Sequence, residues 1–216
     1  MGVTVTVRGT AEAFHRPERA TVHFRVAFDG PQQAAVFAST RAAAAQIADE
    51  ISSMHSPDDG PVTWWSTDQL HSWSERGMGK DGSLPPAHHA TIGFAVKFSD
   101  FERLGAWLGT VGEYPGVSIE RIEWALTRVR EAQLVPDVRW RAVADARQRA
   151  QTYADAFGLG EVTVVAIAEP GLLPHAAHPE MTLMRASVAS GSGQALEFVP
   201  QDVRLDASID VVFTAG

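Results

Sequence analysis

The residues best suited to chemistry in this chain lie in one short stretch, residues 62–73, VTWWSTDQLHSW. It holds three of the six tryptophans together with an aspartate, a histidine and two serines. Indole rings can line a ligand pocket, and a histidine beside a carboxylate can act as an acid or a base. Binding is the only role predicted for these residues, and no catalytic residue or metal ligand is predicted. The candidate binding residues are Trp64, Trp65, Asp68, His71 and Trp73.

The β-forming residues of this stretch indicate a strand, in which neighbouring side chains point to opposite faces of a sheet. The alternation predicts that Trp64 and Asp68 share one face and that Trp65, His71 and Trp73 share the other. The two adjacent indoles then diverge, so one is expected in the core and the other under a helix, a loop or a partner chain. Packing or an interface is therefore favoured over a sugar-binding platform.

Residues 77–82, GMGKDG, match the dinucleotide-binding pattern G-x-G-x-x-G in letters alone. That pattern requires a helix directly after it, whose N-terminus meets the pyrophosphate. Here Pro85 and Pro86 follow and block such a helix. The stretch is predicted to be a hairpin loop, and no cofactor is expected.

Metal and nucleophile motifs are weak in this chain. His88 and His89 are adjacent and would point to opposite faces of a strand, while His175 and His178 lack the spacing H-E-x-x-H. The sequence around Ser190 is no nucleophile elbow, because no apolar strand precedes it. The absence of cysteine excludes thiol catalysis and thiolate zinc sites. These patterns favour a protein without catalytic activity.

The net charge of -8 gives the chain no general attraction for nucleic acid. Residues 128–149 carry six arginines, but Glu131, Asp137 and Asp145 are interspersed, which is typical of a solvated helix face. No apolar run is long enough for a membrane span, and the first residues do not resemble a signal peptide. A cytoplasmic location and no nucleic-acid partner are predicted.

Alternating apolar residues predict strands at about 3–9 and 21–28, joined as a hairpin, and a second hairpin formed by residues 62–73 and 91–98. Further strands are expected at 119–126, with a bulge near Arg121, and at 161–168 and 203–213.

Three helices are expected between these strands. A helix opening at Pro31 carries an apolar stripe, a short helix spans about 100–111, and a long helix, kinked or started at Pro136, ends at Gly158. The stripe of the first helix is Phe37, Thr40, Ala44, Ile47 and Ile51, and that of the long helix is Ala142, Ala146, Ala150 and Ala154.

Hairpin strands with inserted helices indicate an α+β protein, in which antiparallel sheets of long hairpin strands pack against two long helices and one short helix. Because no composition break divides the chain, one domain is predicted over residues 1–216, with flexible loops at about 75–88 and 170–195.

Two ordered sets of residues resemble the SIMPL-domain family. The first is V-x-V-x-G at residues 5–9 followed by P-E-x-A-x-V at 17–22, and the second is the alanine-rich helix followed by G-L-G at 158–160 and by Val162. The closing strand after Pro200 also fits, so the resemblance covers nearly the whole chain.

The resemblance implies an α+β fold in a largely bacterial family of unknown function, without established catalytic residues. One periplasmic member forms a ring-like oligomer, and an animal member is a signalling adaptor. Many relatives carry an export leader, which is not visible here.

The leading hypothesis is therefore a non-enzymatic protein that acts by self-association or protein–protein contacts, as a homo-oligomer or with a protein partner. The alternative is a small-molecule-binding protein or a hydrolase with a pocket near the tryptophan-rich strand and the loop at 170–194. A third hypothesis is nucleic-acid binding by the arginine-bearing helix, which would show strong salt dependence.

Overall fold

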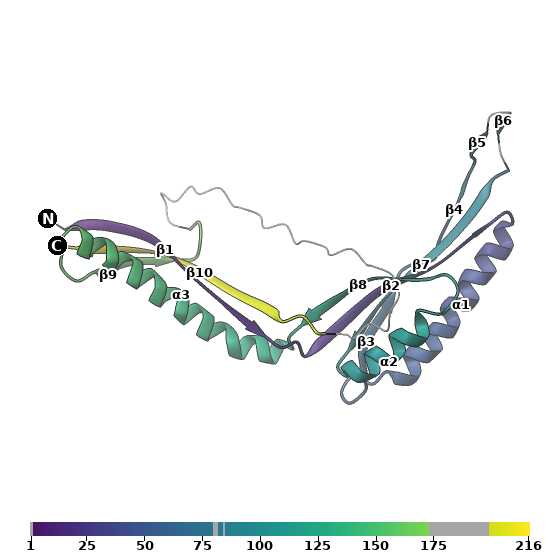
Figure 1. The fold of residues 1–216 in the computed structure, drawn as a ribbon, viewed down its shortest axis with the longest axis horizontal. Helices are drawn as coiled ribbons and strands as arrows, with labels where there is room; N and C mark the ends of the chain where they lie inside the picture. Colours follow the sequence, from purple (N-terminus) through teal and green to yellow (C-terminus); the bar gives the residue numbers. More distant parts are fainter. Residues whose placement is uncertain (1, 80–81, 84, 173–198) are drawn as a thin grey trace. The chain divides into compact units, whose positions relative to one another are not determined.

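The computed structural model describes residues 2–79, 82–83, 85–172 and 199–216 (Figure 1). They form two compact units, one made of residues 1–16 with 127–216 and the other of residues 17–126. Each unit has its own antiparallel sheet, here called sheet A in the first and sheet B in the second. The prediction of one domain over the whole chain stays a prediction.

Sheet B contains five strands in the unit of residues 17–126. The strand order is β3-β7-β2-β8, and β4 also pairs with β7. A separate ribbon of β5 and β6 lies between β4 and β7, where the sequence predicted a hairpin loop rather than a dinucleotide site. The elements are β2 (Arg19–Gly30), α1 (Gln33–Met54), β3 (Val62–Thr67), β4 (His71–Glu75), β5 (Met78–Gly79), β6 (Gly82–Ser83), β7 (Ala87–Phe98), α2 (Phe101–Val111) and β8 (Val117–Ala125).

One face of sheet B is the core of this unit. Phe24 of β2 stacks on Phe94 of β7, and Trp107 of α2 packs edge-on against Phe24. Asp100 caps α2 by accepting hydrogen bonds from two backbone N–H groups of its first turn. Helices α1 and α2 lie on the same face of the sheet (Figure 1).

Helix α1 departs from the predicted stripe at one position. Val36 is buried and Phe37 is exposed, whereas Thr40, Ala44, Ile47 and Ile51 are buried as predicted. The helix begins at Gln33 rather than at Pro31, so the inward-facing position of its first turn falls on Val36. The predicted bulge in β8 is confirmed, because the register shifts between Arg121 and Ile119 opposite His23 and Phe24.

Sheet A contains three strands in the order β1-β10-β9. The elements are β1 (Val3–His15), α3 (Arg128–Ala156), β9 (Thr163–Ala168) and β10 (Val203–Ala215). The predicted hairpin between the first two strands is wrong: β1 continues past Gly9 to His15 and pairs with β10, whereas β2 pairs with β7 and β8. Alternation identifies the buried face of a strand but not its neighbour.

Helix α3 lies along β1 and β10 (Figure 1), and its predicted stripe of four alanines is fully buried. Thr127 caps its N-terminus, and the helix runs through Pro136 instead of starting there. The close approach depends on Gly9, since a Cβ there would lie 2.0 Å from the backbone oxygen of Ala142. Small residues on both surfaces thus allow helix and sheet to touch through their backbones.

Candidate functional site

The open face of sheet B, opposite α1 and α2, carries four of the five predicted binding residues. In β3, Trp64 pairs with Lys97 of β7, and in β4, Trp73 pairs with His89. The odd-numbered residues of β7 face away from the core, since Phe94, Val96 and Phe98 are buried. Trp64 and Trp73 therefore lie on the same face, and the prediction that Trp64 and Trp73 lie on opposite faces is wrong.

The reason is a break at residues 68–70. Thr67 pairs with Phe94 and His71 with Thr91, so β3 and β4 use four steps where β7 uses three. The extra residue reverses the alternation, as a bulge does. The carboxylate of Asp68 lies over Gly93, only 2.4 Å from where a Cβ would be. Asp68 and His71 consequently join Trp64 and Trp73 on the open face, while Trp65 pairs with Val96 and points toward the core.

Trp73 is the centre of an aromatic cluster on this open face. Its ring stacks on His89 at 5.1 Å and lies 5.4 Å from the ring of His71. Its indole N–H donates to Glu75 at 3.2 Å. Farther along the sheet, the Lys97 ammonium lies 5.3 Å from the Trp64 ring centroid, within cation–π range. The exposed indoles thus already have protein neighbours on one side.

Ion pairs occupy the other end of the open face. Arg25 pairs with Glu120, and Glu123 accepts from Arg121 at 2.9 Å and lies 3.4 Å from His23. The pKa of Glu123 is lowered, mainly by the hydrogen bond from Arg121, against a smaller opposing effect of partial burial. These charges neutralise one another locally, which leaves no concentrated field for an anionic polymer.

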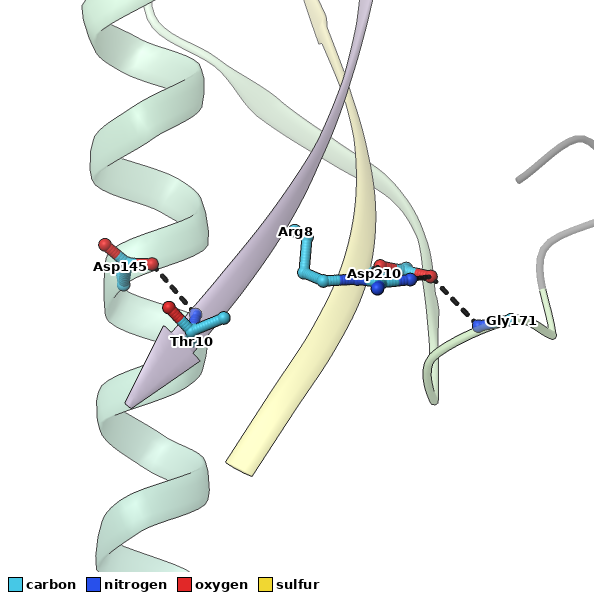
Figure 2. Close-up of polar contacts among 5 residues, drawn as sticks. All are labelled: Arg8, Thr10, Asp145, Gly171 and Asp210. Carbon is cyan, nitrogen blue, oxygen red and sulfur yellow. Dashed lines mark hydrogen bonds and ion pairs between the residues drawn. The ribbon is translucent and has the colours of Figure 1, made fainter. Parts of the chain in front are cut away.

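Sheet A has an edge of a different kind, formed by β9. The strand TVVAIA has no charged residue, and Val164, Val165 and Ile167 are 52%, 63% and 58% exposed. No described strand pairs with its outer edge. At the opposite edge of the sheet, the Thr10 N–H of β1 donates to Asp145 of α3 at 2.9 Å (Figure 2). Asp145 thus binds one N–H group of the β1 edge, while β9 presents an apolar edge of the type that associates with other strands.

A buried carboxylate contacts the turn that follows β9. Asp210 of β10 is bound by two nitrogens of Arg8, at 2.6 and 2.9 Å, and accepts the Gly171 N–H at 3.1 Å (Figure 2). The carboxylate raises the pKa of Arg8 through this hydrogen bond. Gly171 has a φ of 80°, a left-handed conformation that glycine adopts at no steric cost. The contact therefore fixes the turn that follows β9.

A groove lies between α3 and the first half of β10, with a volume of about 530 Å³. Its apolar lining includes Val138 and Ala142 of α3 and Leu205, Ala207 and Ile209 of β10. Charged residues also line it, namely Glu131, Arg139, Glu169, Arg204 and Asp206. This space is here called the β10 groove. The sequence indicated the apolar row of β10 but not that, among the described strands, β9 would pair with only part of β10, because that depends on where β9 ends.

Other predicted features can be placed only in part. Within the described residues, no three histidine, aspartate or glutamate side chains are arranged to hold a metal ion. His88 and His89 lie on opposite faces of β7 as predicted. His175, His178, Ser190 and most of the loop predicted at 170–195 lie outside the described residues. Among the helices that are described, none is both long and apolar enough to cross a membrane.

Sheet A with α3 and sheet B with α1 and α2 define an α+β protein, whose described surface includes an apolar strand edge and an indole-bearing sheet face. The model of the SIMPL family, described as "Protein of unknown function (DUF541)", matches residues 5–213. The chain belongs to this family. No curated protein matches it significantly.

Proposed function

We propose that this protein acts without catalysis, by binding other copies of itself or protein partners through the β9 edge. The observation that carries the proposal is the run of exposed β-branched side chains on a strand whose outer edge no described residue pairs with. Burial of such side chains contributes about 25 cal/mol per Å² of apolar surface, and edge pairing adds backbone hydrogen bonds.

A lysine at position 167 tests this proposal. Ile167→Lys is expected to weaken self-association at least about tenfold, because a charged side chain on an edge strand opposes pairing. Light scattering across a range of concentrations measures the effect. Val129→Lys is the matched control, since Val129 is 69% exposed on α3, away from β9, and its replacement should leave the mass unchanged. A wild-type chain that stays monomeric at high concentration and retains no partner in pull-downs would contradict the proposal.

The stacked cluster around Trp73 favours a second candidate function, the binding of a small molecule on the open face of sheet B. The indole and its two imidazole neighbours form a ridge flanked by Glu75, and such aromatic groups stack on planar rings or on sugars. The hydrolase version of this hypothesis has weaker support, since no serine is placed as a nucleophile beside Asp68 and His71 in the described hydrogen bonds.

Thermal shift with a panel of monosaccharides and nucleobases tests the second candidate. A compound that binds the ridge should raise the melting temperature of the wild type but not that of Trp73→Ala. Trp140→Ala is the control, because Trp140 is an exposed tryptophan on α3. If no compound raises the melting temperature of the wild type more than that of Trp73→Ala, this second candidate function is wrong. The predictions of a cytoplasmic location and of no nucleic-acid partner stay predictions.

A further inference from the structure

The edge of sheet A has a step. All thirteen residues of β10 pair with β1 on one side, but β9 pairs only with the segment from Asp210 to Thr214 on the other. The segment from Val203 to Ile209 therefore has no described strand beside it on the β9 side. Backbone groups along such an edge can accept an added strand.

The chain that follows β9 turns at the end of this step, where Glu169 and Pro170 line the β10 groove. Asp210 lies on the sheet face opposite α3, because its neighbours Ile209 and Val211 pack toward the helix. By accepting the Gly171 N–H, its carboxylate draws the turn toward that far face (Figure 2). Beyond this turn, no strand of the described residues pairs with Val203–Ile209 on the β9 side.

The β10 groove has apolar side chains where α3 faces β10, and its lining also includes the charged residues Glu131, Arg139, Glu169, Arg204 and Asp206. Side chains of Leu205, Ala207 and Ile209 form its floor along β10, and α3 forms its wall with Val138 and Ala142. A strand added here would alternate its side chains between this apolar space and the opposite face of the sheet. The free edge is seven residues long, about 23 Å at the usual rise per residue.

We propose that β9 of a second copy fills this step, so that two chains exchange β9 strands across a two-fold axis. The inference rests on the proposed function, self-association through β9, and specifies its geometry. The donor matches the apolar side of the site, which faces α3, since β9 has six residues, no charge and exposed valine and isoleucine side chains. Each chain supplies one strand and one step, so a two-fold rotation uses both and closes the assembly as a dimer.

The rotation also fixes the strand direction. β9 runs antiparallel to its own β10. A two-fold axis perpendicular to the sheet reverses the direction of every strand in the second copy. The β9 strand of one copy therefore runs parallel to β10 of the other. Ile167 pairs with Val211 and so faces α3, as does Ala207. In the exchanged pair these two side chains, one from each copy, come close together.

Engineered cysteines test this arrangement in the full chain, which has no cysteine of its own. Within one chain, Ala207 lies four positions along β10 from the partner of Ile167, about 13 Å away, which is too far for a disulfide. Mixing Ile167→Cys chains with Ala207→Cys chains under mild oxidation is expected to give a disulfide-linked dimer on a non-reducing gel. Each single variant alone should remain mostly unlinked.

The other outcomes separate the inference from the proposed function. Linkage of Ile167→Cys chains with one another, but not with Ala207→Cys chains, would show direct β9–β9 pairing and overturn strand exchange while keeping self-association. A wild type that is monomeric by light scattering would remove both proposals. A dimer with no linkage in any mixture would place its interface elsewhere and would also overturn strand exchange.

Discussion

Replacing Gly9 by alanine is expected to destabilise the unit of residues 1–16 and 127–216 by about 3 kcal/mol or more. A Cβ at this position would lie 2.0 Å from the Ala142 backbone oxygen and 2.7 Å from the Ala146 backbone nitrogen. Both contacts involve helix backbone, so no change of rotamer relieves them. The helix must move away from the sheet, and the contacts of the buried alanines weaken with it.

Urea denaturation followed by circular dichroism measures this loss. Gly160→Ala is the matched control in the same unit, because the nearest atom to its added Cβ lies at 3.4 Å, an ordinary contact distance. It should change the free energy of unfolding by no more than about 0.5 kcal/mol. Equal stability of Gly9→Ala and wild type would show that α3 does not lie against β1 as described.

The fold class followed from the sequence because each buried surface has a clear period. Alanines four residues apart predicted the face of α3 that packs on sheet A, and alternating apolar residues predicted the buried faces of β2, β7 and β10. Strand pairing did not follow. The alternation in β1 fits equally well beside β2 or β10, which is about two hundred residues away, and nothing local distinguishes the two neighbours.

The candidate site was predicted in part for a related reason. The residues of the tryptophan-rich stretch were identified, but their faces were assigned as if the strand were continuous. One extra residue at 68–70 reversed the alternation and brought Trp64 and Trp73 together. The sequence identified β9 only as a β-rich run. Its exposure could not be predicted, because it depends on the position of β9 at the edge of sheet A and on the length over which it pairs with β10. β9 ends at Ala168, and the turn after it contacts Asp210, which lies 39 positions from Gly171 in the sequence.

Arg8→Ala is expected to cost about 2 kcal/mol of stability, which is below the range for a fully buried pair because the Arg8 side chain is 39% exposed. The side chain of Asp210 is only 5% exposed, so the substitution leaves a buried carboxylate without its guanidinium partner. The penalty arises from that buried charge more than from the lost contact.

The direction of the stability change caused by a second substitution, Asp210→Asn, tests this explanation. Asp210→Asn in the Arg8→Ala background should restore part of the lost stability, because a neutral amide needs no counter-charge and its oxygen still accepts the Gly171 N–H. In the wild-type background the same change should be destabilising, since it removes the charge that Arg8 binds. A double-mutant cycle by urea denaturation measures both effects. If Asp210→Asn lowers stability equally in the two backgrounds, the Arg8 guanidinium does not offset the charge of Asp210.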